Sequence, residues 1–197
     1  MKKRLIVTVI ASLVLAFSPQ SSQANDLAIW DKLQGTNPKG YVLLLRHAYA
    51  PGVGDPANFR LGDCSTQRNL SEEGRQDARE IGDWLERRDI PIHRIESSRW
   101  CRAKETADLL NLGKVKLNPK LDSLFQESDI DNHPKTLRAR QQIINHRKKS
   151  GLLIMVGHFV NIGALTGIGV GSGEGVLVRA SKKGSIKVVG ATPALGR

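Results

Sequence analysis

Apolar residues along the chain form two kinds of pattern: short continuous runs and longer stretches with helical spacing. The two strongest continuous runs are YVLLL at 41–45 and LLIMV at 152–156. Runs of this length between polar segments predict strands that are buried on both faces. Weaker strand patterns, of which the last two predict a hairpin, lie at 92–96, 115–117, 175–180 and 185–189.

Four stretches with helical spacing predict helices. The first begins after Ser71, a good capping residue, and has Glu72 and Glu73 near the positive end of the helix dipole. The other helices are expected at 102–110, 134–149 and 161–166. The residues expected to face inward from the helix at 134–149 are Leu137, Ile143 and Ile144.

The alternation of strands and helices indicates the fold class. We expect an α/β three-layer sandwich with a mostly parallel central sheet and helices on both faces. The segment 48–69, rich in Gly, Pro, Asp and Asn, predicts a long loop after the first strand. Because no repeat or low-complexity tract divides the chain, residues 25–197 are expected to form a single domain.

The first 24 residues differ from the rest of the chain. A basic start at 1–4 precedes an apolar run at 5–17 and a polar stretch with small residues at Ser22 and Ala24. This order is typical of a secretory signal peptide cleaved after Ala24. An uncut membrane anchor is disfavoured, because a span needs roughly 20 apolar residues. We therefore expect a periplasmic or secreted protein without stable membrane insertion after cleavage.

Charge narrows the class of partner. The net charge is +11, and removal of residues 1–24 takes away three cations and no acid, which leaves +8. A basic protein attracts anions such as phosphates, nucleic acids and acidic lipids. Nucleic acid is disfavoured, because few aromatic stacking partners lie among the basic residues. The expected partner is a small anionic phosphorylated substrate, and no pattern indicates an oligomeric state.

Two cysteines, Cys64 and Cys101, leave two alternatives open. They can form a disulfide in an oxidising compartment, or they can remain separate buried thiols. The chain has no CxxC pair and no His/Cys cluster with zinc spacing. We therefore expect neither a metal ion nor another cofactor.

Residues suited to phosphate binding follow three of the predicted strands. These residues, each at or shortly after a strand end, are Arg46, His47, Arg102 and His158. The carboxyl ends of parallel strands form one edge of an α/β sheet, where ligands bind. We therefore expect the two arginines and two histidines to meet there.

This combination suits phosphoryl transfer. Guanidinium groups match pairs of phosphate oxygens, and a helix that begins near Arg102 would add backbone donors. A neutral imidazole can attack phosphorus when its other nitrogen keeps a proton that a backbone carbonyl accepts. Charge spread over Arg46, Arg102 and His158 would stabilise the transferring group without a metal ion.

Four short motifs occur in order between about residues 41 and 165. They are Arg-His-Ala at 46–48, Leu-Ser-Glu-Glu-Gly at 70–74 with Ala78, Ser98 with Arg102-Ala103 and Thr106-Ala107, and Gly157-His158. Together they resemble the histidine phosphatase superfamily, in its phosphoglycerate-mutase-like branch. The resemblance implies a metal-independent phosphoric monoester hydrolase with His47 as phosphohistidine nucleophile and a phosphate pocket of Arg46, Arg102 and His158. The chain is also weakly similar to exported phosphatases of lipopolysaccharide core heptose phosphate.

One feature of the family is missing. Many members have a glutamate in a Leu-x-Glu segment that protonates the leaving oxygen, and Ser123 stands in that place here. Asp122 or Glu127 is a candidate substitute, although each also fits an ordinary surface carboxylate. A general acid contributes ~10²–10⁴ in rate. The alternative function is therefore a weakly active or inactive binding protein for phosphate or sugar phosphates, whereas the expected export disfavours a mutase.

Several other residues carry weaker expectations. Arg60 and Arg68 in the long loop are expected to be solvated rather than to contact substrate. Asn161 is expected to cap or orient His158, and the glycine-rich segment 169–175 to form a turn near the pocket. The histidines expected at the surface are His93, His133 and His146.

Overall fold

The computed structural model describes residue 28, residues 30–31 and 33–34, and residues 37–192. The predicted signal peptide at 1–24 lies outside the described residues, so its cleavage stays a prediction. Among the residues described, no helix is both long and apolar enough to cross a bilayer.

The described strands form one six-stranded sheet with β4 and β1 at its centre. In spatial order the strands are β3 (Val115–Leu117), β2 (Ile92–Ser97), β4 (Leu152–Gly157), β1 (Tyr41–Arg46), β5 (Gly175–Ala180) and β6 (Ile186–Ala191). The first four run parallel, and the closing hairpin of β5 and β6 is antiparallel. The sheet is therefore mostly parallel, as predicted.

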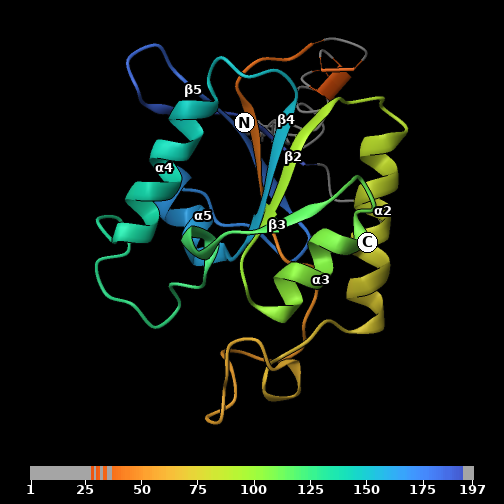
Figure 1. Ribbon diagram of the computed structural model, residues 1–197, viewed down its shortest axis with the longest axis vertical. Helices are drawn as coiled ribbons and strands as arrows, with labels where there is room; N and C mark the ends of the chain where they lie inside the picture. Colours follow the sequence, from red (N-terminus) through yellow and green to blue (C-terminus); the bar gives the residue numbers. More distant parts are fainter. Residues whose placement is uncertain (1–27, 29, 32, 35–36, 193–197) are drawn as a thin grey trace, which may run out of the picture.

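Helices cover both faces of this sheet (Figure 1). One face carries α2 (Glu72–Glu86) and α3 (Cys101–Leu109), and the other carries α4 (Pro134–His146) and α5 (Phe159–Thr166). Two single-turn 3₁₀ helices, η1 (Cys64–Thr66) and η2 (Pro119–Leu121), lie in the connections. This arrangement confirms the predicted three-layer α/β sandwich.

Two apolar cores explain the continuous apolar runs. Alternate residues of a strand point to opposite faces, so Leu43 and Leu45 join the core under α2 and α3. Val42 and Leu44 join the core under α4 and α5. All residues of β4 are buried. A central strand covered on both faces needs apolar residues at every position, which is why β1 and β4 lack polar alternation.

The helices lie where the sequence predicts them, and their ends differ from the predicted ends by at most three residues. The Ser71 hydroxyl caps α2 as expected, accepting from the Gly74 N–H at 3.0 Å. The helix α4 ends at His146, before the predicted end at 149, because the chain turns toward β4 through Gly151, whose φ is +79°. The helix α5 begins at Phe159 rather than at 161.

The prediction for the inward face of α4 is partly wrong. Ile143 is buried and Ile144 is half-buried, but Leu137 is 49% exposed. The buried stripe of α4 has helical spacing and consists of Thr136, Ala139, Ile143 and His146. Leu137 lies outside this stripe, one position after Thr136.

The three histidines expected at the surface lie in different environments. His93 is exposed. His133 is half-buried and caps α4, its Nδ1 accepting from the Lys135 N–H at 3.2 Å. His146 contradicts the expectation, because it is buried and its Nε2 lies 3.0 Å from the carbonyl oxygen of Gly151.

Close backbone packing accounts for the glycine of the 70–74 motif. A Cβ atom at Gly74 would lie 2.1 Å from the carbonyl oxygen of Tyr49. The Ser71 N–H donates to the same oxygen at 3.1 Å. The first turn of α2 is thereby held against the chain that follows His47.

Candidate active site

The four residues expected to bind phosphate line one cavity of about 260 Å³, here called the His47 cavity. Arg46 and His47 reach it from the end of β1, Arg102 from the first turn of α3, and His158 from the end of β4. The loop between β1 and α2, at the bottom of Figure 1, supplies another wall. The structure thus brings all four side chains together at the carboxyl edge of the parallel strands.

Both ring nitrogens of the buried His47 have a polar neighbour. Nδ1 lies 2.8 Å from the carbonyl oxygen of Ala48, and Nε2 lies 3.3 Å from Nε of Arg102. A carbonyl oxygen only accepts and an arginine N–H only donates, so the neutral ring carries its proton on Nδ1. The lone pair is therefore on Nε2, which faces the guanidinium of Arg102.

The charge state of His47 follows from its surroundings. Burial is the main reason that its pKa is lowered to about 3. The hydrogen bond with Ala48 raises the pKa, whereas the positive charges of Arg102, Arg46 and Arg68 lower it further. At neutral pH the ring is therefore uncharged, which is the form that can attack phosphorus.

Backbone hydrogen bonds hold His47 in place. Its N–H donates to the carbonyl oxygen of Gly157 at 2.9 Å. The following N–H, of Ala48, donates to the Thr106 hydroxyl at 3.0 Å, and that hydroxyl donates to the carbonyl of Arg102 at 2.7 Å. Thr106 thus connects the histidine segment to the helix that carries Arg102, which gives a physical reason for this motif residue.

The glycine-rich segment before β5 contacts the Arg46-His47 pair. The Gly173 N–H donates to the carbonyl of His47 at 3.2 Å, and the carbonyl of Val170 accepts from Arg46 Nη1 at 2.9 Å. The guanidinium of Arg46 also stacks over the Phe159 ring, 5.1 Å from its centroid. These contacts orient the Arg46-His47 pair.

His158 is buried beside the first histidine. The two ring centroids lie 5.4 Å apart, and His158 Nε2 lies 2.9 Å from the hydroxyl oxygen of Ser98. Burial lowers the pKa of His158 well below its usual value, and His47 and Arg102 lower it further. His158 is therefore neutral and is oriented by Ser98.

A carboxylate that no motif singles out, Asp55, faces Arg102. Arg102 donates to it through Nη1 at 2.6 Å and through Nη2 at 3.2 Å. The indole N–H of Trp100 donates to Oδ2 at 2.9 Å. Burial raises the pKa of Asp55, but the hydrogen bonds from Arg102 and Trp100 hold it below its usual value. The only sequence signal for Asp55 is its position in the loop that follows His47.

Arg68 also lines the cavity, which contradicts the expectation that it is solvated. Its Nε donates to the carbonyl of Gly54 at 2.9 Å, and its Nη1 donates to the carbonyl of Ala50. Arg60 lies at the surface as expected, with a side chain that is 71% exposed and paired with Asp63. The loop has no periodicity from which the direction of either arginine could have been predicted.

Neither carboxylate considered as a proton donor lines the His47 cavity. Asp122 is buried and accepts from Arg99, from its backbone N–H at 3.0 Å and from its Nε at 2.9 Å. Glu127 is exposed and lines an adjacent cavity, together with Asp55 and Trp100. Of these three carboxylates, only Asp55 reaches the arginines around His47.

Asn161 and the Cys101 N–H, both expected near the site, bind other groups. The Asn161 side chain does not bind the His158 ring but accepts from the backbone N–H of Leu124 at 3.2 Å. At the start of α3, the Cys101 N–H donates to the side chain of Gln67 at 3.0 Å. The Cys101 N–H is therefore engaged within the protein, and the donor side chains that line the cavity include the guanidinium groups of Arg46, Arg68 and Arg102.

Cys64 and Cys101 form a disulfide, with Cα atoms 5.7 Å apart. Cys101 directly precedes Arg102, and Cys64 belongs to the same loop as Asp55. The disulfide therefore connects two walls of the His47 cavity.

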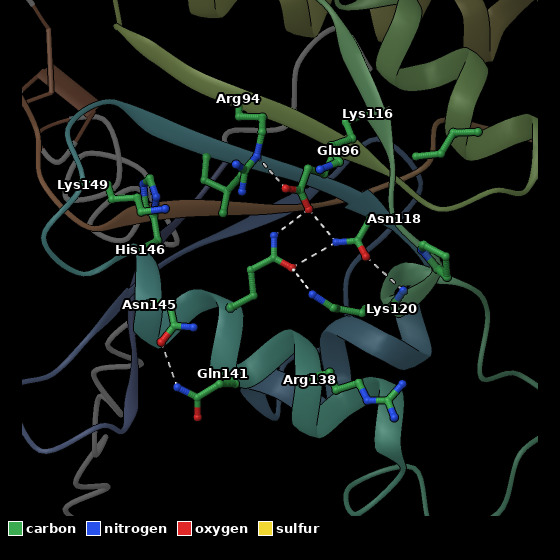
Figure 2. Close-up of a pocket in the computed structure, with 14 residues that line it drawn as sticks. Arg94, Glu96, Lys116, Asn118, Lys120, Arg138, Gln141, Asn145, His146 and Lys149 are labelled. Atoms are coloured by element: carbon green, nitrogen blue, oxygen red, sulfur yellow. Dashed lines mark hydrogen bonds and ion pairs between the residues drawn. The ribbon is translucent and has the colours of Figure 1, made fainter.

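A second cavity, of about 560 Å³, lies between α4 and the strands β2 and β3, and is here called the α4 cavity (Figure 2). The cations that line it are Arg94, Lys116, Lys120, Arg138 and Lys149. The buried Glu96 lines the same cavity, where it pairs with Arg94 at 2.6 Å and accepts from Asn118 at 2.5 Å and Gln142 at 2.6 Å. In the described part of the chain, no three His, Cys, Asp or Glu side chains gather as a metal site would require.

A family profile identifies the class of protein. The profile of the histidine phosphatase superfamily (branch 1) matches residues 42–159, which is more than half of the chain. The chain belongs to this superfamily, whose members are phosphatases, in agreement with the motifs. A search of curated proteins by sequence gave no significant match.

Solved structures share the fold at low sequence identity. The protein histidine phosphatase SixA, solved with tungstate, is 16% identical with a TM-score of 0.56, over 77% of this chain and 96% of that one. A mutant phosphoserine phosphatase from Entamoeba histolytica, solved with phosphoserine, is 12% identical with a TM-score of 0.55, over 79% and 98%. The phosphoserine phosphatase with 3-phosphoglyceric acid is 14% identical with a TM-score of 0.56, over 79% and 98%.

Proposed function

We propose that the protein hydrolyses small phosphate monoesters through a phosphohistidine intermediate on His47. The observation that carries this proposal is the geometry of His47, whose unprotonated Nε2 faces the guanidinium of Arg102 at 3.3 Å. Arg46 and Arg68 line the same cavity, so positive charge surrounds the place where a phosphoryl group would meet the nucleophile. Membership in a superfamily of phosphatases supports the reaction class.

The proposed reaction has two steps. In the first, Nε2 of His47 attacks phosphorus and the bond to the ester oxygen breaks. The carbonyl of Ala48, which accepts from Nδ1–H, stabilises the positive charge that forms on the ring. In the second step, water attacks the phosphohistidine, the bond between nitrogen and phosphorus breaks, and phosphate leaves. Arg46, Arg102 and His158 hold the phosphoryl oxygens throughout.

The shape of the cavity favours a small substrate with an apolar part. Its lining combines the arginines with Val53, Phe125 and Phe159, all exposed apolar side chains. The carbon skeleton of the leaving group would contact these residues. Phosphoserine and 3-phosphoglyceric acid, bound in the structures of the fold relative, are small phosphate monoesters, which supports this substrate class.

We also propose that the protein acts outside the cytoplasm after cleavage behind Ala24. The Cys64–Cys101 disulfide supports an oxidising compartment. Amino-terminal sequencing of the protein recovered from a periplasmic extract or from the medium should begin at Asn25. Recovery of the uncut chain with the membrane fraction would contradict cleavage.

The function is tested by screening wild type and His47→Ala against aryl phosphates, sugar phosphates, nucleotides and phosphorylated lipopolysaccharide fragments. Wild type should hydrolyse at least one class in the presence of a chelator, and an alkaline quench should trap phosphohistidine. The kcat/KM of His47→Ala should fall about 10³-fold or more, because this change removes the proposed nucleophile, and the neighbouring His158 has its Nε2 next to the Ser98 hydroxyl. His93→Ala, which changes an exposed histidine, is the matched control.

Two outcomes would contradict the proposal. Full activity of His47→Ala would exclude the phosphohistidine route. Tight binding of phosphate by wild type, with no phosphohistidine and no turnover on any substrate, would identify a binding protein instead.

A further inference from the structure

The Asp55 carboxylate accepts hydrogen bonds from the Arg102 N–H groups that a phosphoryl group beside His47 would also need. The terminal nitrogens of Arg102 lie 2.6 and 3.2 Å from the Asp55 carboxylate, and Nε lies 3.3 Å from His47 Nε2. A carboxylate and a phosphoryl group bind the same forked donor. A phosphoryl group placed for attack by Nε2 therefore competes with the Asp55 carboxylate for the guanidinium of Arg102.

Building on the proposed function, we propose that Asp55 is a placeholder that substrate displaces from Arg102 and that then protonates the leaving oxygen. Of the described residues that line the His47 cavity, Asp55 alone has a carboxyl group. Before substrate enters, Asp55 accepts the hydrogen bonds of the buried Arg102 guanidinium. During the reaction it acts as the general acid in place of the family glutamate, whose position Ser123 occupies here.

Displacement is feasible because of how the loop is held. The Arg102 side chain is 4% exposed, whereas that of Asp55 is 17% exposed, so a released carboxyl group can meet water. Arg68 binds the carbonyls of Ala50 and Gly54, so the backbone of the loop can stay in place while the side chain of Asp55 leaves Arg102. A phosphoryl dianion carries more charge than the carboxylate and can engage Arg46 at the same time.

Displacement also explains how Asp55 gains a proton. Burial raises its pKa, and the hydrogen bonds from Arg102 and Trp100 outweigh that effect. When Arg102 turns to the phosphoryl group, both of its hydrogen bonds to Asp55 are lost, while the burial remains and a negative charge arrives. Trp100 still donates to Oδ2 at 2.9 Å, whereas Oδ1 keeps only the longer contact of 3.5 Å from the Arg68 N–H, so Oδ1 is the oxygen that takes the proton. Besides the two histidines, the charged groups that face Asp55 across its two cavities are Arg46, Arg68, Arg102, Glu127 and Lys135.

The bonds and protons balance over the cycle. The proton on Oδ1 comes from the monoanionic ester or from solvent. As Nε2 bonds to phosphorus, the phosphorus–oxygen bond breaks and the leaving oxygen takes the Oδ1 proton, so the product departs as an alcohol. The Asp55 carboxylate then accepts a proton from the attacking water, whose oxygen bonds to phosphorus as the Nε2–phosphorus bond breaks. Asp55 loses this proton to solvent and returns to Arg102.

The test compares Asp55→Asn with wild type on two leaving groups. For glycerol phosphate, kcat/KM should fall roughly 10²–10³-fold, because an alkoxide needs a proton to leave. For 4-nitrophenyl phosphate the fall should be less than about tenfold, because nitrophenolate leaves unprotonated. The inhibition constant of inorganic phosphate should fall roughly tenfold, because a neutral amide competes less well for Arg102. Asp63→Asn, in the same loop and paired with Arg60, should match wild type in all three measurements.

Two results would overturn the role of Asp55: equal losses on both leaving groups, or unchanged or weaker inhibition by phosphate. Should Asp55→Asn fail to fold, the role of Asp55 is tested on wild type by measuring kcat/KM for a series of phosphate esters whose leaving groups differ in pKa. A donor makes kcat/KM nearly independent of the leaving-group pKa, and a steep dependence would contradict it.

Failure of the proposed function has a separate signature. With 4-nitrophenyl phosphate, Asp55→Asn should accumulate phosphohistidine, because the attacking water has lost its base. Absence of phosphohistidine in both wild type and variant would reject the phosphatase mechanism. Phosphohistidine in both, with equal leaving-group selectivity, would reject only the role of Asp55.

Discussion

The His47 cavity and the α4 cavity both gather positive charge, but they hold it differently. In the His47 cavity, the buried guanidinium of Arg102 faces the neutral ring of His47 and the carboxylate of Asp55, which we propose an anion replaces. In the α4 cavity, exposed and half-buried cations share the lining with Glu96, whose carboxylate already has Arg94, Asn118 and Gln142 as partners. A buried charge interacts more strongly than a solvated one. We therefore base the proposed reaction site on the buried guanidinium of Arg102 next to the neutral imidazole of His47, and not on positive charge alone.

The largest expected difference between the cavities is in catalysis. Arg102→Lys should lower kcat/KM by roughly 10²–10³-fold, because a lysine ammonium cannot donate in a fork to phosphoryl oxygens. The matched change in the α4 cavity, Arg138→Lys, should leave kcat/KM within about a factor of two, because an exposed cation is screened by water. Steady-state kinetics of both variants on one aryl phosphate measure the contrast. Similar losses in the two variants would show that the cavities are not functionally distinct.

The disulfide gives the His47 cavity a covalent support. Removing it with Cys64→Ser and Cys101→Ser should lower the free energy of unfolding by up to ~4 kcal/mol, given the separation of 37 residues between the cysteines. Urea unfolding of the double variant measures this loss. Wild type under dithiothreitol should move in the same direction, and an unchanged midpoint in both would contradict a supporting role.

A smaller loss of stability is expected from the α4 cavity. Glu96→Ala removes the acceptor shared by Arg94, Asn118 and Gln142 and should lower the free energy of unfolding by about 3 kcal/mol. Glu96→Gln should lose less, because one acceptor oxygen remains. The kcat/KM of the folded fraction should not change in either variant. A loss of kcat/KM without a loss of stability would connect the α4 cavity to catalysis.

The smallest effect is a dependence of stability on pH. The pKa of His47 is lowered from 6.5 to about 3 in the folded protein, so the unfolded chain binds more protons below pH 6.5. The stability contributed by the neutral ring is therefore complete above pH 6.5 and is lost as the pH falls toward the folded pKa. Between pH 6.5 and 5.5 the loss should be about 1 kcal/mol for this ring. Urea unfolding at both pH values should show a smaller loss for His47→Ala, and equal losses would contradict the neutral state.

The fold was predictable because its signals are local. Apolar runs at β1 and β4 follow from burial on both faces, and the Ser71 cap follows from the orphan N–H groups of a helix start. The error at Leu137 has a different cause. Several stripes of α4 have helical spacing, and only the packing against the sheet selects the stripe through Ala139 and Ile143.

The sequence by itself determined the class of protein and four of the residues that line the His47 cavity. The residues Arg46, His47, Arg102 and His158 follow strand ends, and strand ends converge in any parallel α/β sheet. Only the tertiary structure decided that Asp55 faces Arg102, that Arg68 lines the cavity, and that Asp122 is engaged with Arg99 instead. The physical reason is that a loop or connection has no repeating geometry, so the direction of its side chains depends on contacts between segments that lie far apart in the chain.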